Sequence, residues 1–362
     1  LKSDGSVACW GNNIEGQLGD ETKVERLMAT PVKGLTTAVA ITVGWRHTCA
    51  LLADATAQCW GDNSAGQLGD GTTESKTTAT PVKELTKVAS ISAGNNHTCA
   101  VRLDSTVHCW GHNKYGQVGE GPSGSAANKL QPSAITGLSG VVSIGTGSQY
   151  TCAQKTDGSV VCWGQNDKGQ LGDGTKAGKN APTAVQWLIA SQRLAAANGF
   201  TCVVEGGGTV ACWGRNESGQ LGDGTTTGRN VPKTINGKEL GHVAAVSAGN
   251  SAKNTSQACA LLTNGQVACW GSNNYGQLGD SGKTDQGGSS TPVAVATLDD
   301  ATALATGRYH SCVVKADGTA ACWGRNNDGQ LGDGTKNTRS TPTPVKGLST
   351  LRAIAAFAYG AC

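Results

Sequence analysis

The tripeptide Cys-Trp-Gly occurs seven times in this chain of 362 residues, and this repetition limits the possible fold more than any other feature. The intervals between successive copies are 50, 50, 53, 50, 57 and 53 residues. After each copy come Asn, Gly, Gln, a second Gly and an acidic residue at similar spacings. The copies begin at Cys9, Cys59, Cys109, Cys162, Cys212, Cys269 and Cys322. A fixed period of this length indicates a repeat architecture, and the copies fill residues 1–362 as one domain with no room for a second.

The repeat unit is predicted to be β-structure. Stretches such as Ala38–Val43 and Val88–Ala93 are short and apolar, and no window sustains a helical period over three turns. Glycine, at 53 residues, has about twice its usual share, which disfavours helices. The clearest hairpin is Cys312–Cys322, where a three-residue loop places Gly318 in the left-handed position. A radial array of such units is a β-propeller, so we predict an all-β fold with seven blades.

The fourteen cysteines follow the same period. Seven belong to the Cys-Trp-Gly motifs, and six of the others lie ten residues before a motif, which places them directly across the hairpin at a closely spaced pair. We therefore predict one disulfide per blade, each closing a loop of about 11 residues. Zinc sites usually use cysteines two to four residues apart, so this spacing favours disulfides over zinc sites or free buried thiols. The expected pairs are Cys49–Cys59, Cys99–Cys109, Cys152–Cys162, Cys202–Cys212, Cys259–Cys269 and Cys312–Cys322.

The seventh pair, Cys9 with Cys362, requires both chain ends to meet in one blade. In the hairpin register, Leu1 follows Cys362 after a gap of one residue. We therefore expect a ring closed by strands from the two termini. Disulfides persist in oxidising compartments, so we expect a secreted, periplasmic or cell-surface protein. Because the chain begins at Leu1 rather than Met, we expect a mature form or an excised region.

Charge and hydropathy exclude two classes of function. The net charge is +3 and charged residues make up 15% of the chain, too few and too mixed for a dedicated nucleic-acid binder. No apolar run reaches the roughly 18 residues that a membrane-spanning helix needs.

These units resemble the repeats of the regulator of chromosome condensation family. The resemblance rests on Gly44–Thr48, which reads Gly-Trp-Arg-His-Thr, then Trp60–Gly61, Asn63, Gly66–Gly69 and Gly71, and it recurs seven times. It implies a seven-bladed propeller with four-stranded blades. It does not imply one function, because members include a nucleotide exchange factor on chromatin, a plant ultraviolet-B receptor and a secreted bacterial inhibitor of β-lactamases.

Two of these family activities fit the residues poorly. The exchange factor works inside the cell, against the expectation from the disulfides. The receptor packs Trp and Arg from motifs on adjacent blades, whereas here Trp45-Arg46 alone has that form.

Positions that differ between the seven copies are free to carry function. The most variable short segment is the pair before His-Thr-Cys and its counterparts in other copies, which propeller geometry places around the channel mouth. Trp, Tyr and Arg at such positions are typical of interface hot spots. The predicted binding patch for a protein partner is Trp45, Arg46, Asn95, Asn96, Gln149, Arg308, Tyr309 and Tyr359. The polar insertion Asn250–Gln257 in the fifth unit is a further loop that could make contacts.

Other residue patterns predict structural roles. The seven tryptophans of the motifs are expected in the core, and Trp187, outside the pattern, is expected as buried filler. The acids after the second Gly, such as Asp20 and Asp70, are expected to serve turns, because one acid per blade cannot surround a calcium ion. A histidine position, occupied by His47, His97 and His310, carries Tyr150 or Phe200 in other copies and is expected to be a packing site.

No catalytic residue, metal site or cofactor is predicted, because no nucleophile motif or ligand cluster occurs. We expect the protein to bind another protein, or a second copy of itself in an assembly, and not nucleic acid. One alternative is a lectin-like propeller that binds a glycan through aromatic residues at blade junctions. Another is an intracellular nucleotide-exchange or chromatin module, which becomes the leading hypothesis if the cysteines are reduced.

Overall fold

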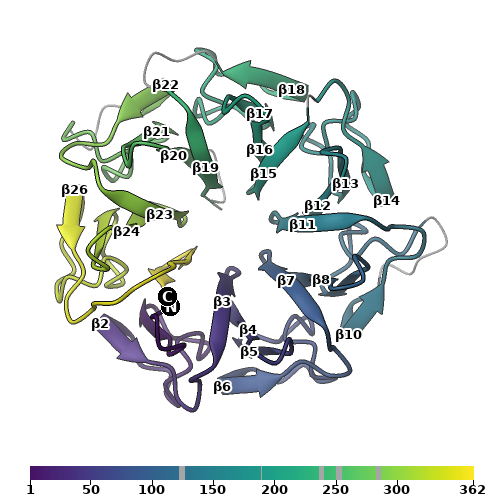
Figure 1. Ribbon diagram of the computed structural model, residues 1–362, viewed down its shortest axis with the longest axis horizontal. Coiled ribbons are helices and arrows are strands. Elements are labelled where there is room, and N and C mark those ends of the chain that lie inside the picture. Colours follow the sequence, from purple (N-terminus) through teal and green to yellow (C-terminus); the bar gives the residue numbers. More distant parts are fainter. Residues whose placement is uncertain (122–126, 189, 236–239, 250–254, 283–286) are drawn as a thin grey trace.

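Seven four-stranded antiparallel sheets stand around a central channel in the computed structural model (Figure 1). The structure describes residues 1–121, 127–188, 190–235, 240–249, 255–282 and 287–362. Within these residues the regular elements are strands, and no helix occurs. The prediction of an all-β, seven-bladed propeller with four-stranded blades is confirmed.

Each blade runs from an innermost strand at the channel to an outer strand at the rim, and in six of the blades the four strands follow chain order. The innermost strands are β3 (Ala38–Val43), β7 (Val88–Ala93), β11 (Val141–Thr146), β15 (Ser191–Ala196), β19 (Val243–Ala248), β23 (Ala301–Thr306) and β27 (Ala356–Phe357). The second strands are β4 (His47–Leu52), β8 (His97–Arg102), β12 (Tyr150–Lys155), β16 (Phe200–Glu205), β20 (Gln257–Leu262), β24 (His310–Lys315) and β28 (Gly360–Ala361).

The remaining strands complete the seven blades. The third strands are β5 (Ala57–Gly61), β9 (Val107–Gly111), β13 (Val160–Gly164), β17 (Val210–Gly214), β21 (Val267–Gly271), β25 (Ala320–Gly324) and β1 (Ala8–Gly11). The outer strands are β6 (Lys76–Pro81), β10 (Lys129–Ala134), β14 (Lys179–Ala184), β18 (Arg229–Ile235), β22 (Ser289–Ala294), β26 (Arg339–Pro344) and β2 (Arg26–Pro31).

The hairpin register between the second and third strands is the one expected from the sequence. In the sixth blade the Lys315 N–H donates to the Thr319 carbonyl at 2.9 Å, and Cys312 lies opposite Cys322. Gly318 closes the loop with φ of 77°. The alternation along this ladder makes Cys312 and Cys322 a narrow pair without backbone hydrogen bonds, which brings their side chains close.

Disulfides join the fourteen cysteines in one such pair per blade, with Cα–Cα distances of 4.0–4.2 Å. In the last blade, the order β27-β28-β1-β2 places a strand from the C-terminus beside one from the N-terminus. Trp10 pairs with Ala361 there, and Cys9 is bonded to Cys362. Ring closure by both termini in one blade is therefore confirmed.

The hydrophobic core lies between neighbouring blades, and the repeated tryptophan links them. The Trp110 indole, for example, is fully buried and donates its N–H to the carbonyl of Gln67 in the preceding blade at 2.9 Å. All seven motif tryptophans make this bond, at 2.9–3.0 Å. Gly69, the second Gly of the repeat, has to be glycine for two reasons. Its φ is +72°, and a Cβ there would lie 2.7 Å from the Trp110 indole nitrogen. The expectation that these tryptophans form core is confirmed.

The prediction for Trp187 is wrong. Its side chain is 78% exposed, in the turn between β14 and β15, and its φ is 55°. Gly34 and Gly347 occupy the matching turn position in other blades, also with positive φ, and a Cβ added to either glycine meets nothing within 4 Å. Any side chain at this turn position points into solvent. The hydrophobic character of Trp187 therefore does not predict its burial.

Candidate functional site

Two sets of loops that vary between repeats open on one face of the ring. Because the strands alternate in direction, the loops from innermost to second strand and those from third to outer strand open on the same side. We call this side the mouth face. It includes loops 44–46, 94–96, 147–149, 197–199, 307–309 and 358–359, and the turns that follow each Trp-Gly, such as 165–170 and 215–220.

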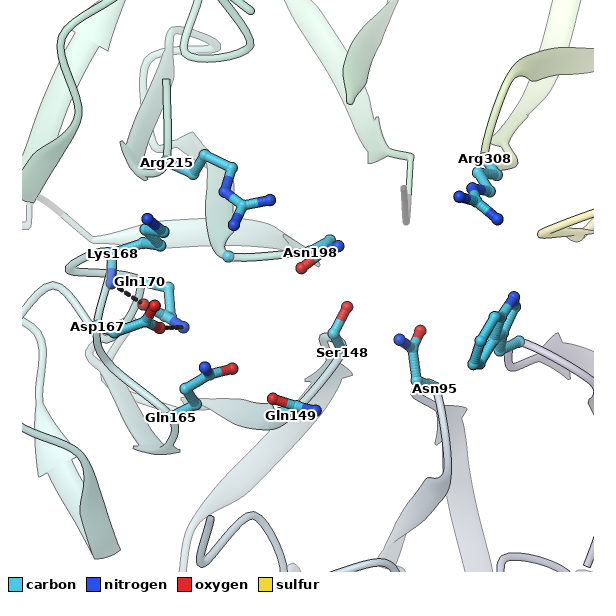
Figure 2. Close-up of a pocket in the computed structure, with 12 residues that line it drawn as sticks. Asn95, Ser148, Gln149, Gln165, Asp167, Lys168, Gln170, Asn198, Arg215 and Arg308 are labelled. Atoms are coloured by element: carbon cyan, nitrogen blue, oxygen red, sulfur yellow. Dashed lines mark hydrogen bonds between the residues drawn. The ribbon is translucent and has the colours of Figure 1, made fainter. Parts of the chain in front are cut away.

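A cavity of about 340 Å³ opens at the channel mouth on this face (Figure 2). Innermost-loop residues of five blades contribute to it, together with the Trp-Gly turns of the third and fourth blades. Most of its lining side chains are polar: Asn95, Ser148, Gln149, Gln165, Asp167, Lys168, Gln170, Asn198, Arg215 and Arg308. Beneath it, the channel narrows to a space of about 80 Å³ bordered mainly by small residues. The mouth is therefore a polar basin above a narrow channel.

The structure places all eight residues of the predicted patch on the mouth face, but it separates them into groups. Trp45, Asn95, Gln149 and Arg308 line the cavity. The other four, Arg46, Asn96, Tyr309 and Tyr359, lie in the same loops outside its lining.

Arg46 turns away from the cavity. Its guanidinium lies 5.1 Å from the centre of the Trp45 ring and 3.5 Å from the Glu15 carboxylate of the last blade. The backbone carbonyl of Asn96 accepts a hydrogen bond from the His112 N–H at 2.8 Å, so this residue also supports the turn beside it.

Two arginines and three tyrosines form a cluster at the junction of the fifth, sixth and seventh blades. The Arg325 guanidinium lies 5.6–5.8 Å from the ring centres of Tyr275, Tyr309 and Tyr359. Arg308 lies 4.8 Å from the Tyr309 ring centre and 5.3 Å from that of Tyr359, and it donates a hydrogen bond to the Tyr359 hydroxyl. Cation–π contacts of this kind hold both arginines in defined orientations.

Sequence reasoning missed the part of this site that comes from a second set of turns. Tyr275 and Arg325 of the cluster, and Gln165, Lys168 and Arg215 of the cavity, come from the Trp-Gly-x-Asn-x-x-Gly turns. The repeated Asn and Gly of that segment indicate a turn, which draws attention away from the variable positions between them. Its x positions vary between copies as strongly as the pair before His-Thr-Cys, and this variation is the signal that could have found them.

The repeat position that carries His47, His97 and His310 is a packing site, as expected. His47, His97 and His310 are fully buried. His47 Nε2 lies 3.0 Å from the hydroxyl of Thr98 in the next blade, and His97 makes the same contact with Thr151. Desolvation lowers the pKa of His47 to about 4 and that of His97 to about 3, so both are neutral at physiological pH.

The repeated acids support turns. Asp223 accepts hydrogen bonds from the N–H and hydroxyl of Thr225 and pairs with Arg229 at 2.6 Å. Burial alone would raise the pKa of Asp223, but these bonds outweigh burial and hold the pKa below its ordinary value. Within the described residues, no three His, Cys, Asp or Glu side chains converge as metal ligands would.

Two other sequence-based expectations concern loops and membranes. Residues 250–254 of the Asn250–Gln257 insertion lie outside the described residues, so its role stays a prediction.

In the part of the chain that the structure covers, no helix has the length and apolar character to span a membrane.

Comparisons with known proteins agree with the architecture. The model of the RCC1-like domain matches residues 1–253, and models of the regulator of chromosome condensation (RCC1) repeat match 243–277, 301–330, 264–314 and 317–361. The human probable E3 ubiquitin-protein ligase HERC4 is 36% identical over 97 residues, which is 26% of this chain and 9% of HERC4. The chain spans about a fifth or less of the length of the curated relatives it matches.

Solved structures resemble the whole ring. Human WBSCR16 has a TM-score of 0.86 at 21% identity, with 98% of each chain covered. Prp20p from Saccharomyces cerevisiae, studied for its binding to Gsp1p and histones, has a TM-score of 0.84 at 18% identity, covering 99% of this chain and 91% of that one. At these identities the likeness concerns the fold.

Proposed function

Since the chain belongs to the RCC1-like family of propellers, we propose that it is a protein-binding module that uses its mouth face, in an oxidising compartment outside the cytosol. The family is known for several activities on one scaffold, so the proposal has to rest on the site. The observation that carries it is the arginine–tyrosine cluster of Arg308, Arg325, Tyr275, Tyr309 and Tyr359, beside the polar cavity.

The cluster has the chemistry of an interface centre. Tyr and Arg are enriched at interfaces because they combine a large apolar surface with polar groups at one end. All five side chains are half-buried, and stacking already restricts their rotamers. Binding a partner therefore requires little further loss of side-chain entropy, which improves affinity.

The seven disulfides support both parts of the proposal. Each one joins the second and third strands of a blade, next to the loops of the mouth face, and so limits motion of those loops. Disulfides of this density are typical of proteins in oxidising compartments. We infer binding rather than catalysis because the recurring histidines His47, His97 and His310 are buried and neutral and every cysteine is bonded.

Site-specific photo-crosslinking tests the choice of face. A benzoylphenylalanine at Asn274, an exposed position beside Tyr275, reports on the mouth face, and one at Leu103, which is 66% exposed in a turn of the opposite face, is the matched control. We expect the Asn274 probe to capture a protein from the extracellular fraction of the producing cells and the Leu103 probe not to. Equal capture by the two probes, or capture by Leu103 alone, contradicts the proposal.

Intact mass tests the compartment. Protein isolated under alkylating, non-reducing conditions is expected to carry no alkyl groups and to gain 14 hydrogens on reduction, since seven disulfides are present. Peptide mapping should recover Cys9 joined to Cys362. Alkylation of most cysteines before reduction would instead favour an intracellular exchange or chromatin module.

A further inference from the structure

The channel-mouth cavity has a surplus of positive charge. Its charged lining residues are Asp167, Lys168, Arg215 and Arg308, three cations and one anion, for a net of +2. Glu217 beside the cavity lies 3.7 Å from the Lys168 ammonium and 3.6 Å from the Arg215 guanidinium, so one carboxylate serves two cations. With Glu217 included, the net charge is still +1, so the cavity favours a negatively charged group, whether a counterion or a ligand.

Of the three cations that line the cavity, Arg308 has no carboxylate partner among the described residues. No Asp or Glu lies within ion-pair distance of it among the described residues, whereas Arg46, Arg215 and Arg325 at the same face each have one. Its contacts are the Tyr309 and Tyr359 rings and the Tyr359 hydroxyl. Its Nε is buried and donates to no group within the described structure, so the terminal amino groups of the guanidinium are the donors that a ligand in the cavity can reach. Stacking therefore fixes the guanidinium while leaving donors unused, which is the arrangement that an anionic ligand needs.

The walls between the two arginines are rich in amides. Figure 2 shows Arg215 and Arg308 on opposite sides of the opening with Asn198 between them, and Gln149 and Gln165 along its lower edge. The side chains of Gln149 and Gln165 make no hydrogen bond to other described residues, so their N–H groups are available to acceptors in a ligand. The cavity volume of about 340 Å³ falls within the range of roughly 300–1,000 Å³ that is typical of ligand sites.

We infer that the channel mouth binds carboxylate side chains of an acidic segment in the partner protein, with Arg308 as the main anchor and Arg215 as the second. This inference rests on the proposed function and specifies the chemistry of the partner. A planar carboxylate matches the fork of a guanidinium, and amides add neutral donors around it. Nucleic acid fits less well, because its backbone needs many cations along one track and the whole chain has a net charge of only +3.

Fluorescence anisotropy with a labelled hexaglutamate peptide tests the inference on the full chain, with hexaglutamine as the neutral probe and a thymidine hexanucleotide as the phosphate probe. We expect saturable binding of hexaglutamate at low ionic strength, weaker binding of the nucleotide, and none of hexaglutamine. Stronger binding of the nucleotide would overturn the assignment to an acidic protein segment.

Variants locate the site. Arg308→Gln should weaken hexaglutamate binding about tenfold, since it removes a charge-assisted bond. Arg193→Gln is the matched control: it removes the same charge from an exposed position in the half of β15 remote from loop 197–199, and should change the affinity by less than about twofold. Gln149→Glu, at a partly exposed position, should weaken binding by like-charge repulsion without disturbing the tyrosine stack.

Equal losses in the Arg308 and Arg193 variants would show general attraction to a basic protein and overturn the inference. Unchanged binding in both Arg308→Gln and Gln149→Glu would do the same. These outcomes differ from a failure of the proposed function, because crosslinking from Asn274 reports a partner on this face whatever its charge.

Discussion

The disulfide between Cys9 and Cys362 should stabilise the protein far more than any disulfide within a hairpin. It joins residues 353 apart in the chain, whereas Cys202 and Cys212 are 10 apart. In the chain-entropy model, the free energy of unfolding gained at 25 °C is about 5.8 kcal/mol for the long loop and about 2.7 kcal/mol for the short one. All four cysteines are no more than 1% exposed, so replacing either pair by alanine removes similar packing. The difference of about 3 kcal/mol therefore reports loop closure.

The assay is guanidinium unfolding followed by tryptophan fluorescence, since seven tryptophans are buried between blades. The double variant Cys9→Ala/Cys362→Ala is compared with Cys202→Ala/Cys212→Ala and with the parent, all with the other six disulfides intact. We expect the first variant to be the less stable of the two by about 3 kcal/mol. Equal losses would refute the reasoning, because they would mean that the ends stay close in the unfolded chain without the bond.

Three further outcomes follow from single contacts. Trp110→Phe removes one of the two donors to the Gln67 carbonyl, leaving the Thr98 hydroxyl, and opens a cavity where the larger indole packed. It should lower the free energy of unfolding by about 1–3 kcal/mol. Trp187→Phe, at the exposed turn, should change it by less than about 0.5 kcal/mol in the same denaturant titration. The pKa of His47 is about 4 in the folded protein and an ordinary 6.5 in the unfolded chain. The unfolded chain therefore takes up the proton first, and the free energy of unfolding should fall as the pH drops from 6.5 toward 4. His47→Phe should make this fall smaller by on the order of 3 kcal/mol, as measured by denaturant unfolding at each pH. The pKa of Asp223 lies below its ordinary value, so its contribution to stability is present at neutral pH and is lost as the pH falls through the folded pKa. Asp223→Asn should therefore make the loss of stability at acidic pH less steep. An unchanged slope at acidic pH would contradict the role of its ion pair with Arg229.

The periodic features of this protein could be predicted from its sequence. The seven copies of Cys-Trp-Gly, the ten-residue cysteine spacing and the loop at Gly318 are local patterns, and each predicts the register of one hairpin. Cys9 has no cysteine ten residues before it and Cys362 has none ten residues after it. The sequence therefore predicts that these two pair with each other, which requires a closed ring. Local chemistry repeated seven times determines the blade and the number of blades.

What the sequence could not show is decided by contacts between blades. The Trp110 indole bonds to a backbone carbonyl 43 residues earlier, so the side chain of Gln67 gives no sign of this role. Arg215 and Arg308 come from turns more than 90 residues apart, and only the curvature of the ring brings both to one cavity. Trp187 was misplaced because exposure depends on where its turn points, not on its side chain. A repeat pattern defines each blade, whereas the site lies in the differences between copies, and these meet only when the ring closes.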